Sequence, residues 1–378
     1  MGGAEAQPDT AAPFWHARAV TTQQPAAQFQ AWQNGLRRSA GEAVAEFVQS
    51  RCTPELADSG VDIAPEVMSQ FIAGGKCLRS TFMYLGWLCG ADDDDAAMRA
   101  AASLELLHAF ALLHDDVMDE AELRRGAPSA HLRFADWHRD RALPGSAGRF
   151  GESAAILLGD LCLVWAEQML RDSGVKPAAL QRVWPRYDAM RTELAVGQFA
   201  DLCNVAPPLP SVEAVLDVAR RKSGNYTVRR PLEIGAAMSG CDERSLWLLG
   251  RYGTAVGEAF QLRDDLLGAF GTPSVTGKPS GSDFFEHKVT SVVAAAHQLA
   301  DASTRRQLLD LMTTDEVDET DLARWRALIT ASGAADWIED MISERVASAR
   351  ELIYRIRIDD SVQAALVSMA AVSTDRAA

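Results

Sequence analysis

The amino-acid sequence predicts an all-α protein built as a single large helical domain. Ala, Leu, Glu and Arg, which favour helices, dominate the composition, and runs of alternating β-branched residues are scarce. Hydrophobic residues make up 48% of the 378 residues, which is enough for a large core. No stretch has a convincing linker composition, and no internal repeat of fixed period is present. These observations favour one helical domain over several smaller ones.

The expected elements follow from the Gly and Pro residues that separate stretches of helical patterning. Residues 1–12 are a polar mixture that is expected to be disordered, and the domain is expected to span residues 13–378. Loops are expected over residues 126–152 and over GTPSVTGKPSGSD. The acids of ADDDDAA are interpreted as a solvated helix start, because the helix dipole favours acids there. The expected helices cover residues 25–51, 81–88, 100–123, 153–172, 178–204, 211–239 and 243–270, with shorter helices over 288–372.

The net charge of −15 argues against nonspecific binding to nucleic acid or to an anionic membrane, because both need a basic surface. The six cysteines form no CxxC motif and show no zinc-ligand spacing, so reduced thiols are expected. No apolar run reaches 18 residues, and the N-terminus lacks the features of a signal peptide. The expectation is a cytoplasmic protein with no nucleic-acid partner and no membrane span.

The stretch LLHDDVMDEAELRRG carries three aspartates followed by two arginines. On a helix, Asp115 and Asp119 lie one turn apart on one face, and Asp116 flanks them. Carboxylates so placed repel unless a cation lies between them, and Mg²⁺ prefers oxygen ligands that it shares with substrate phosphates. Arg124 and Arg125 have guanidinium groups suited to paired hydrogen bonds with phosphate. The alternative is a solvated charged face, which the preceding apolar run LELLHAFALL disfavours.

A second acidic pair, Asp264 and Asp265, lies in AFQLRDDLLGAFG after an apolar stretch that contains Gln261. Taken alone, such a pair is more typical of a surface. Together with the first motif, it predicts two acidic helices that face each other across a cavity and hold a metal cluster from both sides.

Basic residues occur where a phosphate site would need them. The two glycines of GGKCLR permit close backbone approach. The candidates are Lys76, Arg79, Lys222, Lys278 and Lys288. Any one of these basic residues, taken alone, is more typical of the protein surface than of a binding site. His108, seven residues before Asp115, is either a core residue or a phosphate donor.

Taken together, these motifs resemble those of the trans-isoprenyl diphosphate synthases, the polyprenyl synthetase family. The matching stretches are GGKCLR, ELLHAFALLHDDVMDEAELRRG, GQFADL, KSGNYT, FQLRDD and GKPSGSDFFEHK. The DDLLG stretch is similar in particular to bacterial geranylgeranyl diphosphate synthases. The resemblance implies about a dozen helices around a central active-site cavity, usually in a homodimer. It also implies head-to-tail condensation of isopentenyl diphosphate with an allylic diphosphate, with three Mg²⁺ ions.

The resemblance assigns roles by motif match. Asp115 and Asp119 would bind two Mg²⁺ ions and Asp264 the third, with Asp116 in support and Asp265 as a supporting metal-site residue. The allylic diphosphate would be held by Arg124, Lys222 and Lys278. Isopentenyl diphosphate would be held by Lys76, Arg79, His108 and Arg125. Gln261 and Ser223 would lie near the carbocation, Lys288 would help to close the site, and the departing diphosphate would act as the general base.

Four positions depart from the family pattern. Gly268 replaces the final Asp of the second motif, Cys77 a common Arg, Ser80 a usual Pro, and His287 a usual Gly. The glycine at position 268 is frequent in this subgroup and is expected to cost little activity. His287 is expected to alter the loop that closes the site.

Product length depends on the helix below Asp115. Phe110 lies five residues before this acid, and Ala111 lies four before it. In the family, aromatic residues at both places accompany a fifteen-carbon product, and one at the fifth place accompanies twenty carbons. Geranylgeranyl diphosphate is therefore favoured over farnesyl diphosphate, although Phe110 is equally suited to a core. Two rival functions are a class I terpene cyclase, which normally lacks the second acidic pair, and a non-catalytic synthase subunit, which typically loses an acidic motif.

Overall fold

The computed structural model describes residues 24–203, 209–272, 281–314 and 317–374, and these are almost entirely helical. The all-α prediction is therefore confirmed. In the described part of the chain, the only strands are β1 (Leu123–Arg124) and β2 (Ala127–Pro128), which pair antiparallel. The predicted disordered segment, residues 1–12, lies outside the described residues, so this domain boundary stays a prediction.

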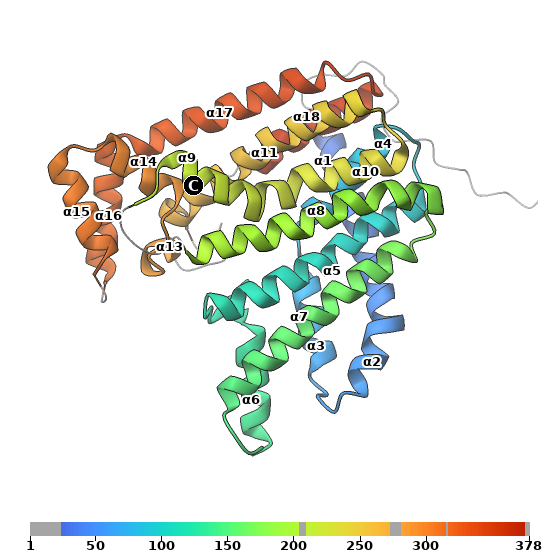
Figure 1. The fold of residues 1–378 in the computed structure, drawn as a ribbon, viewed down its shortest axis with the longest axis horizontal. Coiled ribbons are helices and arrows are strands. Elements are labelled where there is room, and N and C mark those ends of the chain that lie inside the picture. The colour runs from blue at the N-terminus through green and yellow to red at the C-terminus, as the bar shows by residue number, and fades with distance from the viewer. Residues whose placement is uncertain (1–23, 204–208, 273–280, 315–316, 375–378) are drawn as a thin grey trace, which may run out of the picture.

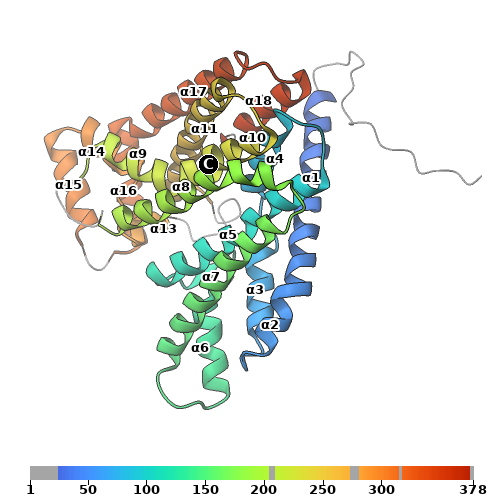
Figure 2. The same ribbon diagram turned by 45° about the vertical axis from the view of Figure 1, so that its right-hand side comes forward.

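The N-terminal half forms one end of the molecule and the arm that extends from it (Figures 1 and 2). Helix α5 crosses this half, and α7 packs along it. The elements are α1 (Gln24–Phe47), a π-helical turn η1 (Val48–Cys52), α2 (Thr53–Ala57), α3 (Ala64–Ile72), α4 (Leu78–Leu88), α5 (Asp95–Met118), α6 (Ala130–Asp140), α7 (Ala147–Arg171) and α8 (Pro177–Leu202).

The C-terminal half is organised around the long helix α11, which packs against α17 and a second π-helical segment, η2. Helices α13 to α16 gather at the end of the molecule opposite α1 (Figure 1). The elements are α9 (Val212–Ala219), η2 (Arg220–Arg229), α10 (Arg230–Ser239), α11 (Glu243–Phe270), α13 (Ser282–Phe285), α14 (Ser291–Leu299), α15 (Ala302–Met312), α16 (Glu319–Ser332), α17 (Ala334–Ile353) and α18 (Asp360–Thr374).

Helix α5 owes its position to an apolar surface on nearly all sides. Residues such as Leu104, Leu106 and Leu113 are at most 1% exposed, so the helix is stabilised mainly by burial. At its start, the Asp94 carboxylate accepts a hydrogen bond from the Ala97 backbone N–H at 2.8 Å. The interpretation of the ADDDDAA acids as a helix start is therefore confirmed.

Two described helices, α5 and α7, are long and apolar enough to cross a membrane by length and composition alone. Of the most apolar window in α5, 61% is buried inside the protein, so its apolar character is explained by its place in the core. The expectation that the chain lacks a membrane span stays a prediction.

Three sequence expectations need correction. The helix expected to continue to residue 123 ends at Met118, because Glu120 takes a left-handed backbone conformation (φ 49°) and the chain turns into the β1–β2 hairpin. The loop expected over 126–152 contains α6 and the start of α7. The helix expected over 211–239 is interrupted by η2, whose ten residues are π-helical.

Candidate active site

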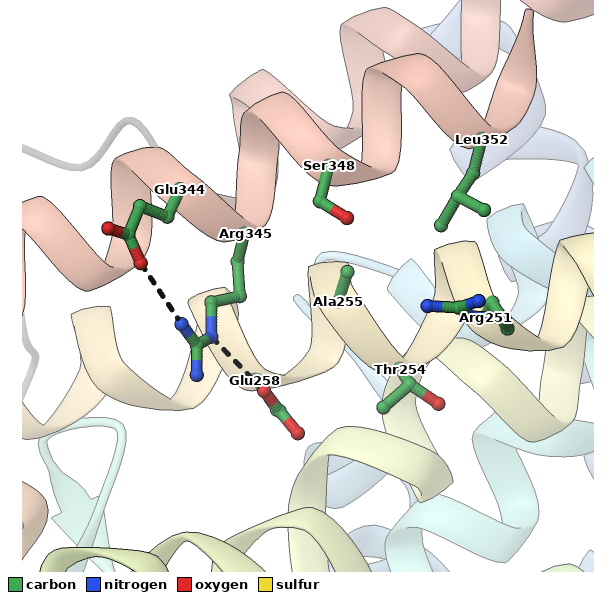
Figure 3. Close-up of a pocket in the computed structure, with 8 residues that line it drawn as sticks. All are labelled: Arg251, Thr254, Ala255, Glu258, Glu344, Arg345, Ser348 and Leu352. Atoms are coloured by element: carbon green, nitrogen blue, oxygen red, sulfur yellow. Dashed lines mark hydrogen bonds and ion pairs between the residues drawn. The ribbon is translucent and has the colours of Figure 1, made fainter. Parts of the chain in front are cut away.

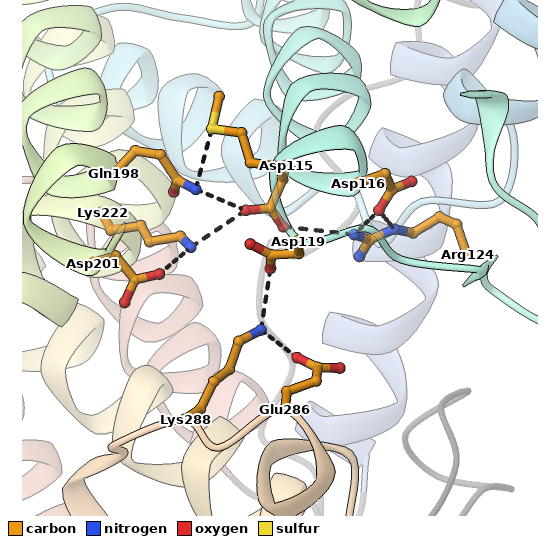
Figure 4. A network of polar contacts seen from close by, with 10 residues as sticks. Asp115, Asp116, Asp119, Arg124, Gln198, Asp201, Lys222, Glu286 and Lys288 are labelled. Carbon is orange, nitrogen blue, oxygen red and sulfur yellow. Dashed lines mark hydrogen bonds and ion pairs between the residues drawn. The ribbon is translucent and has the colours of Figure 1, made fainter. Parts of the chain in front are cut away.

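The first acidic motif occupies the C-terminal end of α5. Asp115 lies in the last turn, and Asp119 caps it through a backbone N–H bond to the Asp115 carbonyl at 2.8 Å. The negative end of the helix dipole disfavours carboxylates at this position. These acids therefore need cationic partners, and three basic side chains supply them (Figure 4).

Two lysines from distant segments each bridge one of these acids and a second carboxylate. The Lys222 ammonium, on η2, lies 3.2 Å from Asp115 Oδ1 and 2.6 Å from Asp201 Oδ2. Lys288 lies 3.1 Å from Asp119 Oδ2 and 2.5 Å from Glu286 Oε2. If the acid of α5 bound another cation, each ammonium would still have a carboxylate partner, Asp201 for Lys222 and Glu286 for Lys288.

Arg124 holds the third acid of the motif. Its Nε donates to Asp116 Oδ1 at 2.8 Å, and its Nη2 lies 3.5 Å from Asp115 Oδ2. Asp116 is fully buried, and its Oδ2 has no hydrogen-bond partner among the described residues. Burial raises the pKa of Asp116, although the charge of Arg124 acts against this. Asp116 therefore holds Arg124, in strand β1, beside Asp115.

The second acidic motif lies near the C-terminal end of α11. Asp264 is half-buried. Asp265 is buried, and its Oδ2 accepts hydrogen bonds from Ser291 N at 2.9 Å and Ser291 Oγ at 2.6 Å. Its Oδ1 accepts from Gln261 Nε2 at 2.8 Å. Burial raises the pKa of Asp265, with these hydrogen bonds acting against it. The contacts favour an orienting role for Asp265, and its predicted role as a metal ligand stays a prediction.

A short segment joins the two acidic motifs across the site. Lys288 contacts Asp119 of α5, and Ser291, three residues later, contacts Asp265 of α11. Residues 288–291 thus contact both acidic motifs, and the expectation that the two acidic helices face each other across a cavity stays a prediction. Ser223 is half-buried within η2, and Lys278 lies outside the described residues.

A second group of basic residues surrounds the start of α4. The Arg79 guanidinium lies 4.3 Å from the ring centroid of Tyr226, and its Nη2 donates to Thr227 Oγ1 at 3.0 Å. Lys76 lies in the loop before α4, and Arg125 donates to the Ala73 carbonyl at the same loop. The expected residues of one diphosphate site are thus gathered around a single loop.

His108 adjoins this group on α5. Burial, and then the charges of Arg79 and Arg125, hold the pKa of His108 well below its usual range, so its imidazole is neutral near pH 7. Among the described residues, no partner is found for His108 Nδ1, Arg79 Nε or the Tyr226 hydroxyl, and all three atoms are buried. Buried polar groups normally have partners, so this place suits a polar, anionic ligand.

Phe110 and Ala111 are half-buried on α5, below the acids. The Phe110 ring meets the His114 ring edge to face, with centroids 4.8 Å apart. Phe110 also packs against the main apolar core. This placement is compatible with both roles considered for Phe110, so its part in chain length stays a prediction.

Several residues of the site were not singled out from the sequence. Gln198 and Asp201 lie in the GQFADL stretch, and Gln198 Nε2 lies 3.4 Å from Asp115 Oδ1. Tyr226 lies in KSGNYT, and Glu286 in FFEHK. Their membership of the matching stretches was the available signal, because nothing local to these residues indicates which distant side chain they contact.

The donors around the site fit Mg²⁺. They are carboxylate oxygens, the hard ligands that Mg²⁺ prefers. In the described part of the chain, no three acidic, His or Cys side chains lie close enough to hold an ion by themselves. Mg²⁺ is usually bound by one or two carboxylates together with phosphate oxygens, and the acids of α5 and α11 are carboxylates of this kind.

A separate pocket of about 450 Å³ lies between α11 and α17, away from the acidic motifs (Figure 3). Its charged side chains are partly satisfied by one another, since Arg345 lies 3.2 Å from Glu258 and 3.5 Å from Glu344.

Comparison with known proteins agrees with this geometry. Residues 61–329 match the family model described as polyprenyl synthetase. The chain is 32% identical to a geranylfarnesyl diphosphate synthase of Aeropyrum pernix over 79% of its length and 88% of the relative's. It is also 32% identical to a geranylgeranyl diphosphate synthase of Mycobacterium tuberculosis, over 73% and 74% of the two chains.

Among solved structures, the chain is similar to geranylgeranyl pyrophosphate synthase from Corynebacterium glutamicum complexed with isoprenyl diphosphate and magnesium. The TM-score is 0.85 at 35% identity, over 90% of this chain and 99% of that one. The match extends over nearly all of the helical architecture described above.

Proposed function

The chain belongs to the polyprenyl synthetase family and is a prenyl diphosphate synthase, and we propose that its product is the twenty-carbon geranylgeranyl diphosphate. The twenty-carbon product is supported by the place of Phe110 on α5, five residues before Asp115, with Ala111 rather than a second aromatic residue after it. The condensation itself is supported by residues 288–291, which contact both acidic motifs, and by the basic group around the start of α4. Relatives of different product length match at equal identity, so the product is argued from this chain's own residues.

Two diphosphates need two sites, and the basic residues form two groups. Arg124 and Lys222 contact Asp116 and Asp115 of α5, and they are proposed to hold the allylic diphosphate, with Lys278 proposed as a third contact. Lys76, Arg79, His108 and Arg125 gather at the α4 loop and are proposed to hold isopentenyl diphosphate. A neutral His108 can donate one hydrogen bond to phosphate without adding charge.

Asp115, Asp119 and Asp264 are proposed to hold Mg²⁺, with three ions expected. Bound Mg²⁺ would neutralise the charge of the allylic diphosphate and so make it a better leaving group. Lys222 and Lys288 contact Asp115 and Asp119, and each has a second carboxylate partner, Asp201 or Glu286, that keeps it near these acids. The two lysine ammonium groups could therefore bind diphosphate oxygens while the acids of α5 bind cations.

The apolar residues of α5 below the acids are proposed to exclude water from the place where the allylic cation would form. Gln261 and Ser223 are proposed to lie near that cation, on α11 and η2. Attack by the double bond of isopentenyl diphosphate leaves a proton to be removed, and the departing diphosphate is the proposed base. Phe110 is the proposed floor of the cavity, and Ala111 leaves room beside it.

A homodimer is proposed from the surface of α7. Leu157, Leu161 and Val164 form one apolar stripe along this helix, and Leu157 and Val164 are 63% and 62% exposed. An exposed apolar stripe on a monomer is typical of a contact surface, and most soluble oligomers are symmetric homo-oligomers. A cytoplasmic location is also proposed, which the six free cysteines support.

A product assay tests this function. The protein, MgCl₂ and isopentenyl diphosphate are incubated separately with dimethylallyl, geranyl and farnesyl diphosphate, and the dephosphorylated products are identified by mass. The expected product is a twenty-carbon alcohol, and Asp115→Ala and Asp264→Ala should give none while retaining their helical circular dichroism. A fifteen-carbon alcohol as the final product from dimethylallyl or geranyl diphosphate would refute the proposed role of Phe110. A cyclised hydrocarbon, or full activity of either variant, would contradict the proposed site.

A further inference from the structure

The carboxylate of Asp265 is held at the start of a helix from another part of the chain. Ser291 is the first residue of α14, and its backbone N–H is one of the donors that a helix leaves without an internal partner. This N–H, at 2.9 Å, and the Ser291 hydroxyl, at 2.6 Å, both donate to Asp265 Oδ2. Both residues are buried, so α14 fixes this carboxylate out of contact with water.

The other oxygen of the same carboxylate fixes an amide. Asp265 Oδ1 accepts a hydrogen bond from Gln261 Nε2 at 2.8 Å. An ionised carboxylate only accepts hydrogen bonds, so it selects the NH₂ end of this amide and leaves the carbonyl oxygen on the other branch. Gln261 is half-buried, and among the described residues no donor to its Oε1 is found. The amide is thus held by its nitrogen, and its oxygen is left for a ligand.

The face of α11 that carries Gln261 leads toward the basic side of the site. One turn before Gln261, an ideal Cβ on Gly257 would lie 2.6 Å from the Gly224 carbonyl oxygen, so α11 and η2 meet there at backbone distance. The contacts along this line show that the two helices run in opposite directions. Beyond Gly224, η2 therefore continues beside α11 with Ser223 and then Lys222, which contacts the first acidic motif. Residues four apart share a helix face, so Gln261 continues the face of Gly257 toward these two residues.

We propose that Ser291 is a positioning residue for the condensation. Through Asp265, it holds the Gln261 amide with its carbonyl oxygen, the negative end of the amide dipole, toward the place where the allylic cation forms. This inference rests on the proposed function, which puts Gln261 near that cation. A dipole that is oriented beforehand stabilises a developing charge without having to reorganise during the reaction.

The hydroxyl group is the part of Ser291 that this role requires. Almost any residue at the first position of α14 would offer the backbone N–H, whereas the second donor to Asp265 Oδ2 comes from the side chain. Without that donor, one buried hydrogen bond would remain to oppose rotation of the carboxylate. The Gln261 amide, which is bound to the other oxygen, would rotate with it.

The test measures the chemical step apart from diphosphate binding. Condensation of geranyl diphosphate with isopentenyl diphosphate is followed in a single turnover with saturating MgCl₂. Ser291→Ala should slow this step about tenfold, the order expected for one hydrogen bond to a charged group. Ser291→Cys, which keeps a weaker donor of similar size, should fall between the two. Calorimetry with inorganic diphosphate and MgCl₂, without turnover, should give the same affinity for all three proteins.

A double-mutant cycle separates positioning from packing. Gln261→Met removes the amide and keeps a side chain of similar length. In this background Ser291→Ala should slow the single turnover by less than about twofold, because the group that Ser291 positions is gone. Ser303→Ala is the matched control, since Ser303 N also donates to an aspartate at a helix start, Asp301 of α15, and it should not change the rate. Circular dichroism and thermal unfolding confirm that each variant is folded.

An unchanged rate in Ser291→Ala would overturn the inference, as would an equal slowing with and without the Gln261 amide. Weaker Mg²⁺-dependent binding of diphosphate in Ser291→Ala would also overturn it, because Ser291 would then act on the metal site. If Ser291→Ala does not fold, Ser291→Cys decides by the same criteria. The proposed function would fail in a different way, since the wild type itself would then give no condensation.

Discussion

The ammonium of Lys222 lies 3.2 Å from Oδ1 of Asp115, the first acid of the α5 motif. Burial would raise the pKa of Asp115, but the charges of Lys222 and Arg124 outweigh burial, and the pKa lies below its usual range. The acid is therefore charged throughout the neutral range, and the protein supplies its counter-charge from within.

This pairing predicts a specific pH dependence of stability. A carboxyl whose pKa is lowered by folding stabilises the folded state above its unfolded pKa of about 4, and loses that contribution as the pH falls through the folded pKa. The difference in unfolding free energy between the wild type and Asp115→Asn should therefore be constant from pH 7 to about 5 and shrink below about 4. Urea unfolding at each pH measures it. A difference that does not change down to pH 3 would show that Asp115 gains nothing from Lys222.

Phe110 is expected to limit product length. Replacing it with Ala removes the ring that meets His114 and opens space below the acids, so the product should lengthen beyond twenty carbons. Phe110→Tyr keeps the ring and serves as the control, with no change in product. Mass analysis of the dephosphorylated products decides the matter, and the same distribution in all three proteins would place the floor of the cavity elsewhere.

His287 occupies a backbone conformation that glycine adopts more easily. Its φ is 51°, and the bonds His287 N to Phe284 O and Lys288 N to Asp283 O form the pattern that ends helices at a left-handed residue. A left-handed conformation costs a residue with a Cβ about 1 kcal/mol. His287→Gly should therefore raise the free energy of unfolding by about that amount, whereas His287→Ala, which keeps the Cβ, should not. Equal effects of the two substitutions would contradict this explanation.

The apolar stripe on α7 should control the oligomeric state. Leu157→Glu puts a charge at the most exposed apolar residue of the proposed contact, and burying it there would be costly. The variant is therefore expected to be monomeric by light scattering at concentrations where the wild type is a dimer. Leu143→Glu, at an exposed apolar residue outside the stripe, is the matched control. A wild-type monomer, or a dimer in both variants, would disprove the assignment.

The expected helix boundaries were most accurate where the hydrophobic pattern and the positions of Gly and Pro agree. Helix α11 spans Glu243–Phe270, as expected. The expectation of a loop over 126–152 was wrong because Pro128, Pro144 and Gly145 flank α6, while residues 130–140 contain neither Pro nor Gly. Gly and Pro mark the ends of elements, and a short helix between two such ends is easily read as part of one loop.

The site shows the same division between local and distant information. The one-turn spacing of Asp115 and Asp119 is a local property, and it could be predicted. The contacts of Lys288 with Asp119 and Glu286 depend on how distant segments pack. The Asp283 carboxylate, which occupies the space that a Cβ of Gly268 would need, likewise depends on how α13 packs against α11.

The π-helical segment η2 has a further consequence for the architecture. Its ten residues carry Lys222 and Ser223 in a helix wound more loosely than its neighbours α9 and α10. A π-helical turn holds one more residue than an α-helical one, and each residue of an α-helix turns the chain by roughly 100°. Deleting one residue within 220–229 would tighten the winding and swing Lys222 away from Asp115, although the fold around it could persist. The looser winding of η2 thus sets the direction in which Lys222 points relative to the side chains of α9 and α10.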